Sequence, residues 1–321
     1  MTSAIKTSNL GKWYKKGVRG QKIEALVDLN LEVREGEVFG FIGGNGAGKS
    51  TTIKILMGLN RPTAGQAFIF DTRIDDPAAR DRVGYLSEHP QFYDFLTPLE
   101  LFRLMGTLRR MEGKRIHQRA DELLHLVALA DASNRRIKGF SKGMVQRLGI
   151  AVALLGDPEL LILDEPMSGL DPLGRHLVAN IIRELQQQGK TIFFSTHIIP
   201  DIETLCDRVG ILVRGHQKYA GSIHEALYPQ GSRFEITVRM PEQWKVEQSS
   251  FARKPLLWQK NVLYRFEIEE TEIAATVQAV MDQGGSVATL EPKRRSLEEL
   301  FLQLSEDSVP NLGDAVPTTV S

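Results

Sequence analysis

The glycines, lysine and serine of the stretch "GGNGAGKS" (43–50) are the residues with the clearest chemical meaning in this sequence. They fit the pattern G-x-x-x-x-G-K-[ST] and stand between an apolar, strand-like run and a segment with helical spacing. Glycines let backbone N–H groups turn inward around phosphate oxygens, and the N-terminus of the following helix adds a partial positive charge. A lysine here attracts the β- and γ-phosphates, and a serine hydroxyl is a Mg²⁺ ligand. The stretch therefore predicts a phosphate-binding loop for a nucleoside triphosphate.

The flanking strand and helix fit this motif as well as the loop does, which argues against a glycine-rich turn with an incidental lysine. Lys49 is the predicted cation for the phosphates, and Ser50 is the predicted metal ligand. The predicted nucleotide contacts of the loop are Gly43, Asn45, Gly46, Ala47, Gly48, Lys49, Ser50 and Thr51. The loop by itself does not separate kinases, GTPases and motor proteins, because all of them share it.

Two adjacent carboxylates follow the apolar run of "LLILDEP" (160–166). Asp164 stands where a strand-end aspartate helps to hold Mg²⁺. Glu165 lies one residue further, where its carboxylate is predicted to polarise a water for attack on the γ-phosphate. A general base must lie within hydrogen-bond distance of the proton that it accepts, and a strand-end position allows this. The apolar residues before the pair favour a buried strand over a surface turn.

The segments around these motifs predict an α/β fold. Residues 5–75 alternate strand-like runs with turns. Residues 80–155 are predicted to be a helical insertion, in which Thr97 and Glu100 form a capping box and Ser141 caps a later helix. Buried apolar strands then alternate with helices, which indicates a mostly parallel sheet with helices on both faces.

The chain is expected to divide into two domains and a tail. The first covers 1–227, with a helical subdomain at about 90–155, and the second is a small α+β domain at 233–304. Residues 305–321 are polar and aperiodic, which predicts disorder. Three cations at 293–295 are interpreted as solvated charges beside a helix cap, with lipid headgroups or nucleic acid as the alternative partners.

Composition excludes several classes of protein. Of the 321 residues, 42% are apolar and 25% are charged, as in ordinary globular domains. Lys and Arg number 40, as do Asp and Glu, so no basic field argues for nucleic acid. The single cysteine, Cys206, excludes an intramolecular disulfide and fits a reducing compartment. No apolar run of about 18 residues occurs and the N-terminus has no signal-peptide pattern, so we expect a membrane role only through a partner.

Four motifs in a fixed order narrow the prediction. "FSKGMVQR" (140–147) precedes "LLILDEP", which precedes "SGLD" (168–171) and "STH" (195–197). In order and spacing the chain resembles, over about residues 5–225, the nucleotide-binding subunit of an ATP-binding-cassette (ABC) transporter. The resemblance implies a P-loop NTPase core with an antiparallel β subdomain and a helical insertion, and it implies ATP and Mg²⁺ as cofactors.

The resemblance also gives roles to residues outside the loop. Tyr14 matches the aromatic residue that stacks on adenine; Trp13 is the rival one position earlier, and a place in the core is the alternative for both. Ser141 and Gly143 match the signature loop, which in the family binds the γ-phosphate of ATP held by the other subunit.

Two further residues are assigned in the same way. Asp171, with Leu170 before it, matches the loop that crosses the seam between two subunits. His197 matches the switch histidine that touches the γ-phosphate, so the predicted catalytic residues are Glu165, His197 and Lys49.

This sequence departs from the family's pattern at two places. The signature usually reads L-S-G-G-Q, but here Lys142 follows the serine and adds a charge near the seam. This "SKGM" form resembles that of bacterial exporters whose permease is a separate chain. Glu88 stands where the family usually has glutamine, with Gln91 as the rival alignment. Glu88 is predicted to hold Mg²⁺ or its water, although it adds negative charge beside the phosphates.

The resemblance implies the ATP-hydrolysing subunit of an exporter, with two subunits that sandwich two ATP molecules head to tail. The second subunit is expected to be an identical copy or a close relative. Residues around 92–112 are expected to act on a separate transmembrane permease at the cytoplasmic face of the plasma (inner) membrane. Two alternatives stay open: a soluble ABC ATPase without a transport role, and a regulatory module that binds ATP without hydrolysing it. No nucleic-acid partner is predicted, because the chain has neither the coiled-coil insertion of repair ATPases nor the second cassette of translation ATPases.

Overall fold

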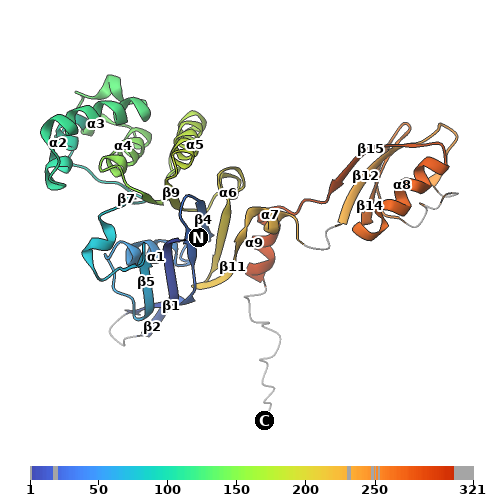
Figure 1. Ribbon diagram of the computed structural model, residues 1–321, viewed down its shortest axis with the longest axis horizontal. Coiled ribbons are helices and arrows are strands. Elements are labelled where there is room, and N and C mark those ends of the chain that lie inside the picture. The colour runs from blue at the N-terminus through green and yellow to red at the C-terminus, as the bar shows by residue number, and fades with distance from the viewer. Residues whose placement is uncertain are drawn as a thin grey trace, which may run out of the picture. The chain divides into compact units, whose positions relative to one another are not determined.

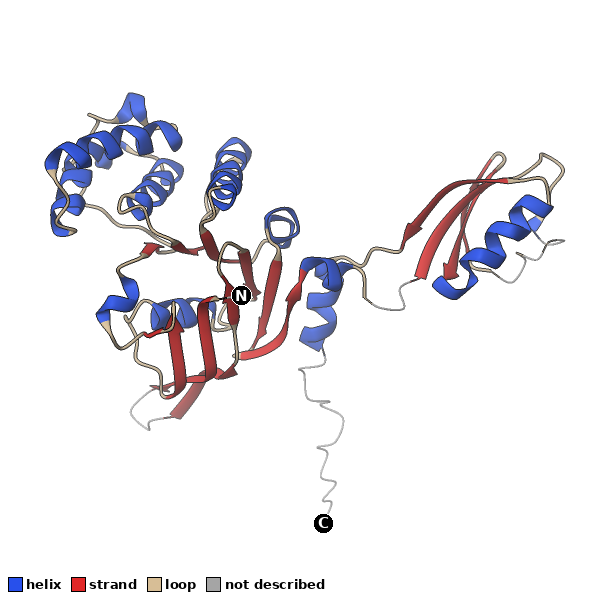
Figure 2. Cartoon of the chain, viewed as in Figure 1, coloured by secondary structure: helices blue, strands red, loops and turns tan. Residues whose placement is uncertain are grey.

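The computed structural model describes residues 2–16, 21–229, 233–246, 249, 251 and 254–306. The chain forms two compact units: residues 1–223 together with 301–321 make the first, and residues 224–300 make the second. The predicted disorder of the tail falls almost entirely on residues 307–321, which lie outside the described residues. Figure 1 and Figure 2 show the helices and strands of each unit.

A mostly parallel half-sheet forms the centre of the first unit, with strand order β10-β4-β9-β8-β7. Its strands are β4 (Val38–Gly43), β7 (Val83–Leu86), β8 (Leu160–Asp164), β9 (Thr191–Thr196) and β10 (Arg208–Val213). Every residue of β4, β8 and β9 is buried, because helices cover both faces, and such strands appear in sequence as unbroken apolar runs. The carboxyl ends of β4, β8 and β9 meet at one edge of the sheet, with Asp164 opposite Ser195 in register.

The other half of this eleven-stranded sheet is mostly antiparallel, in the order β6-β5-β1-β2-β11, with β3 paired to β1. The strands are β1 (Ser3–Lys16), β2 (Gln21–Leu29), β3 (Glu32–Arg34), β5 (Ala64–Ile69), β6 (Thr72–Arg73) and β11 (His216–Ser222). This half is the expected antiparallel subdomain.

Helices surround the sheet and extend beyond β7 as a separate helical group (Figure 1). Those beside the sheet are α1 (Lys49–Leu56), α5 (Pro172–Gln187) and α6 (Ile199–Leu205). The helical group holds α2 (Pro98–Leu108), α3 (Gly113–Leu126) and α4 (Lys142–Leu154). Short 3-10 turns lie at Pro77–Arg80, Ala130–Ala132 and Ile137–Gly139. The capping box of Thr97 and Glu100 and the Ser141 cap are confirmed.

One expectation for this region is wrong in detail. The first residues of the segment expected to be helical form β7, the last strand of the parallel half-sheet, which pairs with β8. Four residues are too few to show a strand period, so the pairing with β8 decides their conformation.

The second unit contains a four-stranded antiparallel sheet in the order β13-β14-β12-β15. Its strands are β12 (Arg233–Arg239), β13 (Leu256–Lys260), β14 (Leu263–Glu269) and β15 (Ser286–Pro292). Its helices are α7 (Ile223–Leu227), α8 (Ile273–Asp282) and α9 (Leu297–Glu306), and a 3-10 turn lies at Glu270–Glu272. Helix α7 begins at one boundary between the units, and α9 crosses the other. The core of the sheet and α8 contains Ile236, Phe266 and Val280 among others. Strands and helices thus occur together here, as expected for the small α+β domain at 233–304.

Candidate functional site

The loop between β4 and α1 has a backbone that requires glycine. Gly46 and Gly48 adopt positive φ angles of 76° and 111°. A Cβ at Gly48 would lie 2.5 Å from the carbonyl oxygen of Ala25, and one at Gly43 would lie 2.5 Å from the carbonyl oxygen of Leu212. The loop therefore packs closely against its neighbours on one side and turns toward the N-terminus of α1 on the other, as an anion-binding loop must.

Lys49 is the cation of this loop and is almost completely buried. Its ammonium group donates a hydrogen bond to the carbonyl oxygen of Gly43 at 2.7 Å and lies 3.7 Å from a carboxylate oxygen of Glu165. A buried ammonium needs such partners, because an unpaired charge is costly to remove from water. The lysine is thus held beside both the loop and the carboxylate at the end of β8.

Asp164 lies at the end of β8 and accepts hydrogen bonds from two serines. Ser195 Oγ donates to Asp164 Oδ1 at 2.5 Å, and Ser50 Oγ donates to the same oxygen at 3.4 Å. Burial raises the pKa of Asp164, the two serines oppose that rise, and the negative charges of Glu88 and Glu165 add to it. The carboxylate of Asp164 is therefore buried from solvent but hydrogen-bonded, next to the Ser50 hydroxyl at the start of α1.

Glu165 follows Asp164 directly. Unlike Lys49 and Asp164, it has a left-handed backbone, with a φ of 50°. Its N–H donates to both the carbonyl oxygen and the Oγ of Ser195, at 3.1 and 3.2 Å. Its Oε2 lies 2.9 Å from Nδ1 of His197, whose side chain is about half exposed. This backbone geometry turns the carboxylate out of the strand direction and toward Lys49 and His197.

A cavity of about 180 Å³ lies over the loop, and it is lined by Gly44, Asn45, Gly46, Ala47, Gly48, Lys49, Ser50, Thr51, Glu88 and Glu165. The structure therefore brings Glu88 to the loop, whereas Gln91 is exposed and does not line this cavity. Gly43 lies behind the loop, where its carbonyl oxygen holds Lys49.

The residues around this cavity fit a nucleotide with Mg²⁺. Ser50, Asp164 and Glu88 offer the hard oxygen donors that Mg²⁺ prefers, and the glycines leave backbone N–H groups for phosphate. Among the described residues, no group of three or more His, Cys, Asp or Glu side chains is arranged to hold a metal by itself. A Mg²⁺ ion that takes most of its ligands from phosphates and water matches that finding.

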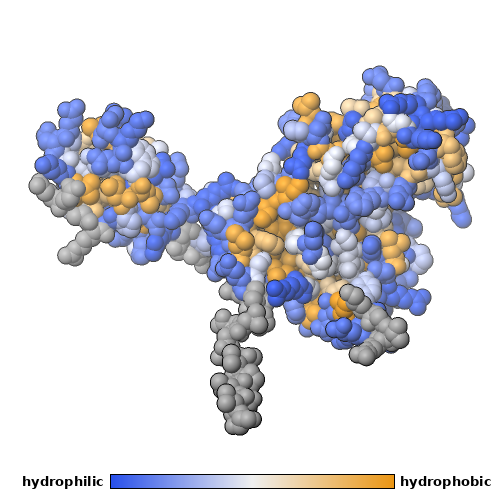
Figure 3. All heavy atoms as spheres, turned by 180° about the vertical axis from the view of Figure 1, so that it is seen from behind, coloured by the Kyte–Doolittle hydropathy of each residue, from blue (hydrophilic) through white to orange (hydrophobic). Residues whose placement is uncertain are grey.

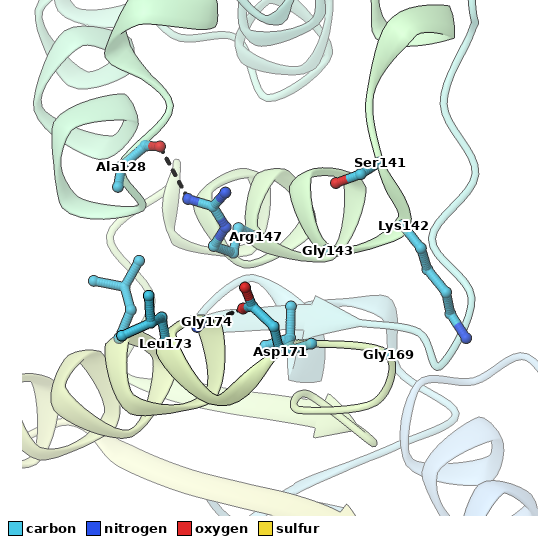
Figure 4. Close-up of a pocket in the computed structure, with 11 residues that line it drawn as sticks. Ala128, Ser141, Lys142, Gly143, Arg147, Gly169, Asp171, Leu173 and Gly174 are labelled. Carbon is cyan, nitrogen blue, oxygen red and sulfur yellow. Dashed lines mark hydrogen bonds between the residues drawn. The ribbon is translucent and has the colours of Figure 1, made fainter.

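Three further predicted residues, Ser141, Gly143 and Asp171, line a different cavity of about 520 Å³ between α4 and α5 (Figure 4). Ser141, Lys142 and Gly143 approach it from the start of α4, and Gly169 and Asp171 approach it from the loop before α5. Ser141 Oγ accepts from the N–H of Met144 at 3.2 Å, and Asp171 Oδ1 accepts from the N–H of Gly174 at 2.8 Å. Both side chains thus cap the helices that they begin.

Lys142 lines this cavity and contacts the loop before α5. Its side chain runs past Gly169, where a Cβ would lie 2.7 Å from Lys142 Cε and 3.1 Å from its Nζ. Gly169 also has a positive φ of 72°. A side chain at position 169 would therefore displace the lysine, and the glycine leaves a path along which the ammonium group reaches the surface.

The two candidate aromatic residues lie on β1. Trp13 and Tyr14 pair with Glu24 and Ile23 of β2, and both are more than a third exposed, so the alternative of a core position is wrong for each. The hydroxyl of Tyr14 accepts a hydrogen bond from Asn60, and the ammonium of Lys12 lies 5.0 Å from its ring centre. The ammonium of Lys22 likewise lies 5.7 Å from the ring centre of Trp13, so each exposed ring has a lysine beside it.

Two polar residues in the site were not assigned from the sequence. Ser195 joins Asp164 and Glu165 from the neighbouring strand, and buried Gln146 of α4 donates to the carbonyl oxygens of Glu165 and Pro166. The signal in the sequence is the place of Ser195 in "STH", two residues before His197. The parallel register of β8 and β9 then places Ser195 opposite Asp164.

Comparisons with known proteins point to one family. The sequence profile described as "ABC transporter" matches residues 26–168. An uncharacterized ABC transporter ATP-binding protein of Nostoc sp. is 38% identical over 98% of this chain and 93% of its own length. The Nod factor export ATP-binding protein I of Cupriavidus metallidurans is 34% identical over 71% of this chain and 74% of its own length.

Solved structures agree with this result. An ATP-binding cassette in a dimeric, post-hydrolysis state bound to ADP and Pi superposes with a TM-score of 0.64. It is 28% identical to this chain and covers 68% of it, while this chain covers 98% of that cassette.

Proposed function

The chain belongs to the ABC transporter family, as an ATP-binding and ATP-hydrolysing subunit, and we propose that it powers an exporter whose permease is a separate chain. A relative named for Nod factor export supports the direction of transport. The "SKGM" signature, which resembles that of exporters with separate permeases, supports it as well.

The observation that carries the proposal is the division of the predicted residues between two cavities. The loop cavity holds Lys49 and Glu165, whereas Ser141 and Asp171 line the cavity between α4 and α5. Among the described residues of the first unit, none lines both cavities. A nucleotide in the loop of one subunit would thus meet Ser141 only from a second subunit, placed head to tail. We propose a homodimer of this kind, with ATP held between each loop and the partner's signature residues.

We assign the chemistry to the residues at the ends of β8 and β9. When bound, Mg²⁺ offsets the charge of the β- and γ-phosphates. Lys49 and Ser50 hold the phosphate side of the site, with Asp164 and Glu88 on the metal side. Glu165 accepts the proton of the attacking water, and His197, at 2.9 Å, orients that carboxylate. Most of the remaining acceleration comes from positioning and charge stabilisation.

A surface on the helical group is the proposed contact with the permease. Tyr93 and Phe95, just before α2, are 59% and 63% exposed, and their rings lie 5.6 Å apart. Exposed aromatic pairs are typical of protein interfaces rather than of solvated surfaces. This pair follows Glu88 in the chain by only a few residues, so movement of the loop on nucleotide binding would reach it directly.

No helix among the described residues is both long and apolar enough to cross a membrane. From the proposed contact with the permease, and not from this finding, we infer that the subunit is attached to the cytoplasmic face of the plasma membrane.

The proposal is tested with Glu165→Gln, which keeps the size of the side chain and removes the base. We expect ATP turnover to fall about 100- to 10,000-fold, the usual contribution of a general base, while ATP binding remains. In ATP the variant should elute as a dimer on size-exclusion chromatography and should co-purify with a multi-span protein from detergent-solubilised membranes. Glu184→Gln, on an exposed face of α5, is the matched control and should behave as the unaltered protein.

Other outcomes would favour the alternatives. Unaltered hydrolysis by Glu165→Gln would remove this residue as the base. Co-purification with ribosomes, DNA or soluble proteins alone would favour a non-transport ATPase. ATP binding by the unaltered protein with no hydrolysis, under conditions in which its dimer forms, would favour a regulatory module.

A further inference from the structure

The turn between α2 and α3 concentrates positive charge in a chain whose total charge is balanced. Residues 103–119 hold six cations and a single carboxylate, that of Glu112, whereas the whole sequence holds 40 of each charge. The six cations are Arg103, Arg109, Arg110, Lys114, Arg115 and Arg119. So dense a cluster creates a local positive field that the net charge of the chain does not reveal.

Two of these six side chains are held against other parts of the fold, and the charge of a third, Arg115, lowers the pKa of Asp157. Arg119 pairs with Glu122 and lies 3.9 Å from Asp157, and the guanidinium of Arg109 lies against Gly156. The four others are exposed and form no hydrogen bond or ion pair with any described residue; they are Arg103, Arg110, Lys114 and Arg115. We call these four the α2–α3 cations.

Three of the α2–α3 cations occupy positions that the backbone itself disfavours. Lys114 and Arg115 stand in the first turn of α3, where the helix end favours anions and where no acidic residue is present. Arg110 follows the end of α2 with a positive φ of 57°, a place usually taken by glycine. These choices lower stability locally, so a role in binding an anionic partner accounts for them better than a role in folding does.

Exposed leucines accompany the cations. Leu108, the last residue of α2, is 71% exposed, and Leu104, one turn earlier on the same face, is 37% exposed. Figure 3 shows hydrophilic and hydrophobic residues side by side on the helical group. Cations beside aliphatic side chains match the boundary between lipid headgroups and acyl chains, whereas a nucleic-acid backbone would make use of the cations alone.

We propose that the α2–α3 turn binds the surface of a phospholipid bilayer that contains anionic lipids. The cations contact the headgroup phosphates, and Leu108 inserts into the headgroup boundary. This surface lies at the other end of α2 from Tyr93 and Phe95, about 16 Å away along an eleven-residue helix. It is therefore separate from the aromatic pair, although its α2 residues fall within 92–112, the segment that the resemblance assigns to the permease contact. The vesicle test uses the subunit by itself.

The test is flotation of the purified chain with vesicles of phosphatidylcholine, either alone or mixed with phosphatidylglycerol. We expect binding only to the mixed vesicles, with a loss on addition of salt. Each cation near an anionic surface strengthens binding about fivefold, so the triple variant Arg110→Gln, Lys114→Gln and Arg115→Gln should bind about 100-fold more weakly. Leu108→Ser, which changes no charge, should bind about tenfold more weakly.

The matched control removes the same charge elsewhere. Lys6→Gln, Arg34→Gln and Lys218→Gln together replace three exposed cations on strands and should leave vesicle binding unchanged. ATP hydrolysis by the α2–α3 triple variant should equal that of the unaltered chain, which shows that it folds and keeps this test independent of the proposed function.

Three results would overturn the proposal. The first is equal binding to the two kinds of vesicle, and the second is equal binding by the two triple variants. The third is a single-stranded oligonucleotide that competes fully with the vesicles and binds Leu108→Ser as well as the unaltered chain, because the surface would then be one for nucleic acid.

Discussion

Replacement of Ser195 by alanine isolates the hydrogen bond that holds Asp164 in its buried position. Ser195 is fully buried, and its hydroxyl donates to Asp164 Oδ1 at 2.5 Å. The N–H of Glu165 also contacts this hydroxyl, but it keeps the carbonyl oxygen of Ser195 as a second acceptor at 3.1 Å, so alanine does not orphan it. The loss is therefore that of one charge-assisted bond, which contributes about 1.5–3 kcal/mol.

The pH dependence of this loss follows from the pKa of Asp164. Burial raises that pKa in the folded protein, and the bond from Ser195 opposes the rise. An acid with a raised pKa lowers stability as pH increases through the interval between its unfolded and folded values. Ser195→Ala raises the folded pKa further, so the extra destabilisation is fully present only above the folded pKa of the variant. It shrinks in acid as Asp164 becomes protonated and no longer needs a donor.

The assay is urea denaturation in EDTA without nucleotide, at neutral and at acid pH, with a double-mutant cycle to Asp164→Asn. In the asparagine background Ser195→Ala should reduce the free energy of unfolding by only about 0.5–1.5 kcal/mol, the contribution of a neutral bond. An equal loss in both backgrounds and at both pH values would refute the reasoning, because it would mean that the serine stabilises by packing alone.

Two further predictions concern the departures from the family's pattern. Glu88→Gln should raise the Mg²⁺ concentration for half-maximal hydrolysis several-fold, because a carboxylate donor is lost. It should also lower the pKa of Asp164, because the charge of Glu88 raises that pKa. Gln91→Ala is the control and should change neither quantity. In the Glu165→Gln background, Lys142→Met keeps the side-chain stem and removes the charge, and we expect the ATP concentration for half-maximal dimer formation to rise by up to about fivefold, as for an exposed charge pair. A size-exclusion titration that gave the same midpoint for both proteins would show that the charge of Lys142 does not contribute to dimer formation.

Local chemistry explains why much of this fold was readable from the sequence. A glycine at position 48 and a capping threonine at position 97 act on neighbouring backbone groups, so their effects need no knowledge of the rest of the chain. The apolar run of β8 shows a buried strand for the same reason. β13 has no such local signal, because all its residues are exposed and show no alternation; only its pairing with β14 defines it as a strand.

The order of motifs determined the family, and with it the predicted site residues. What the sequence did not determine is which of these residues meet. Glu88 was the predicted ligand and Gln91 the rival alignment, and only the turn after β7 shows that Glu88 lies at the loop. Ser195 had no assigned role until the parallel pairing of β8 and β9 placed it opposite Asp164.

The separation of the signature residues from the phosphate loop is also a property of the tertiary structure alone. Spacing along the chain places Ser141 before Glu165, but only the packing of α4 against the sheet shows that its hydroxyl lines another cavity. Local sequence fixes helices, turns and buried strands because those depend on neighbouring residues. The contacts that make this site join residues far apart in the chain, such as Ser50 and Asp164, which are 114 positions apart, and these distances are set only when the sheet forms.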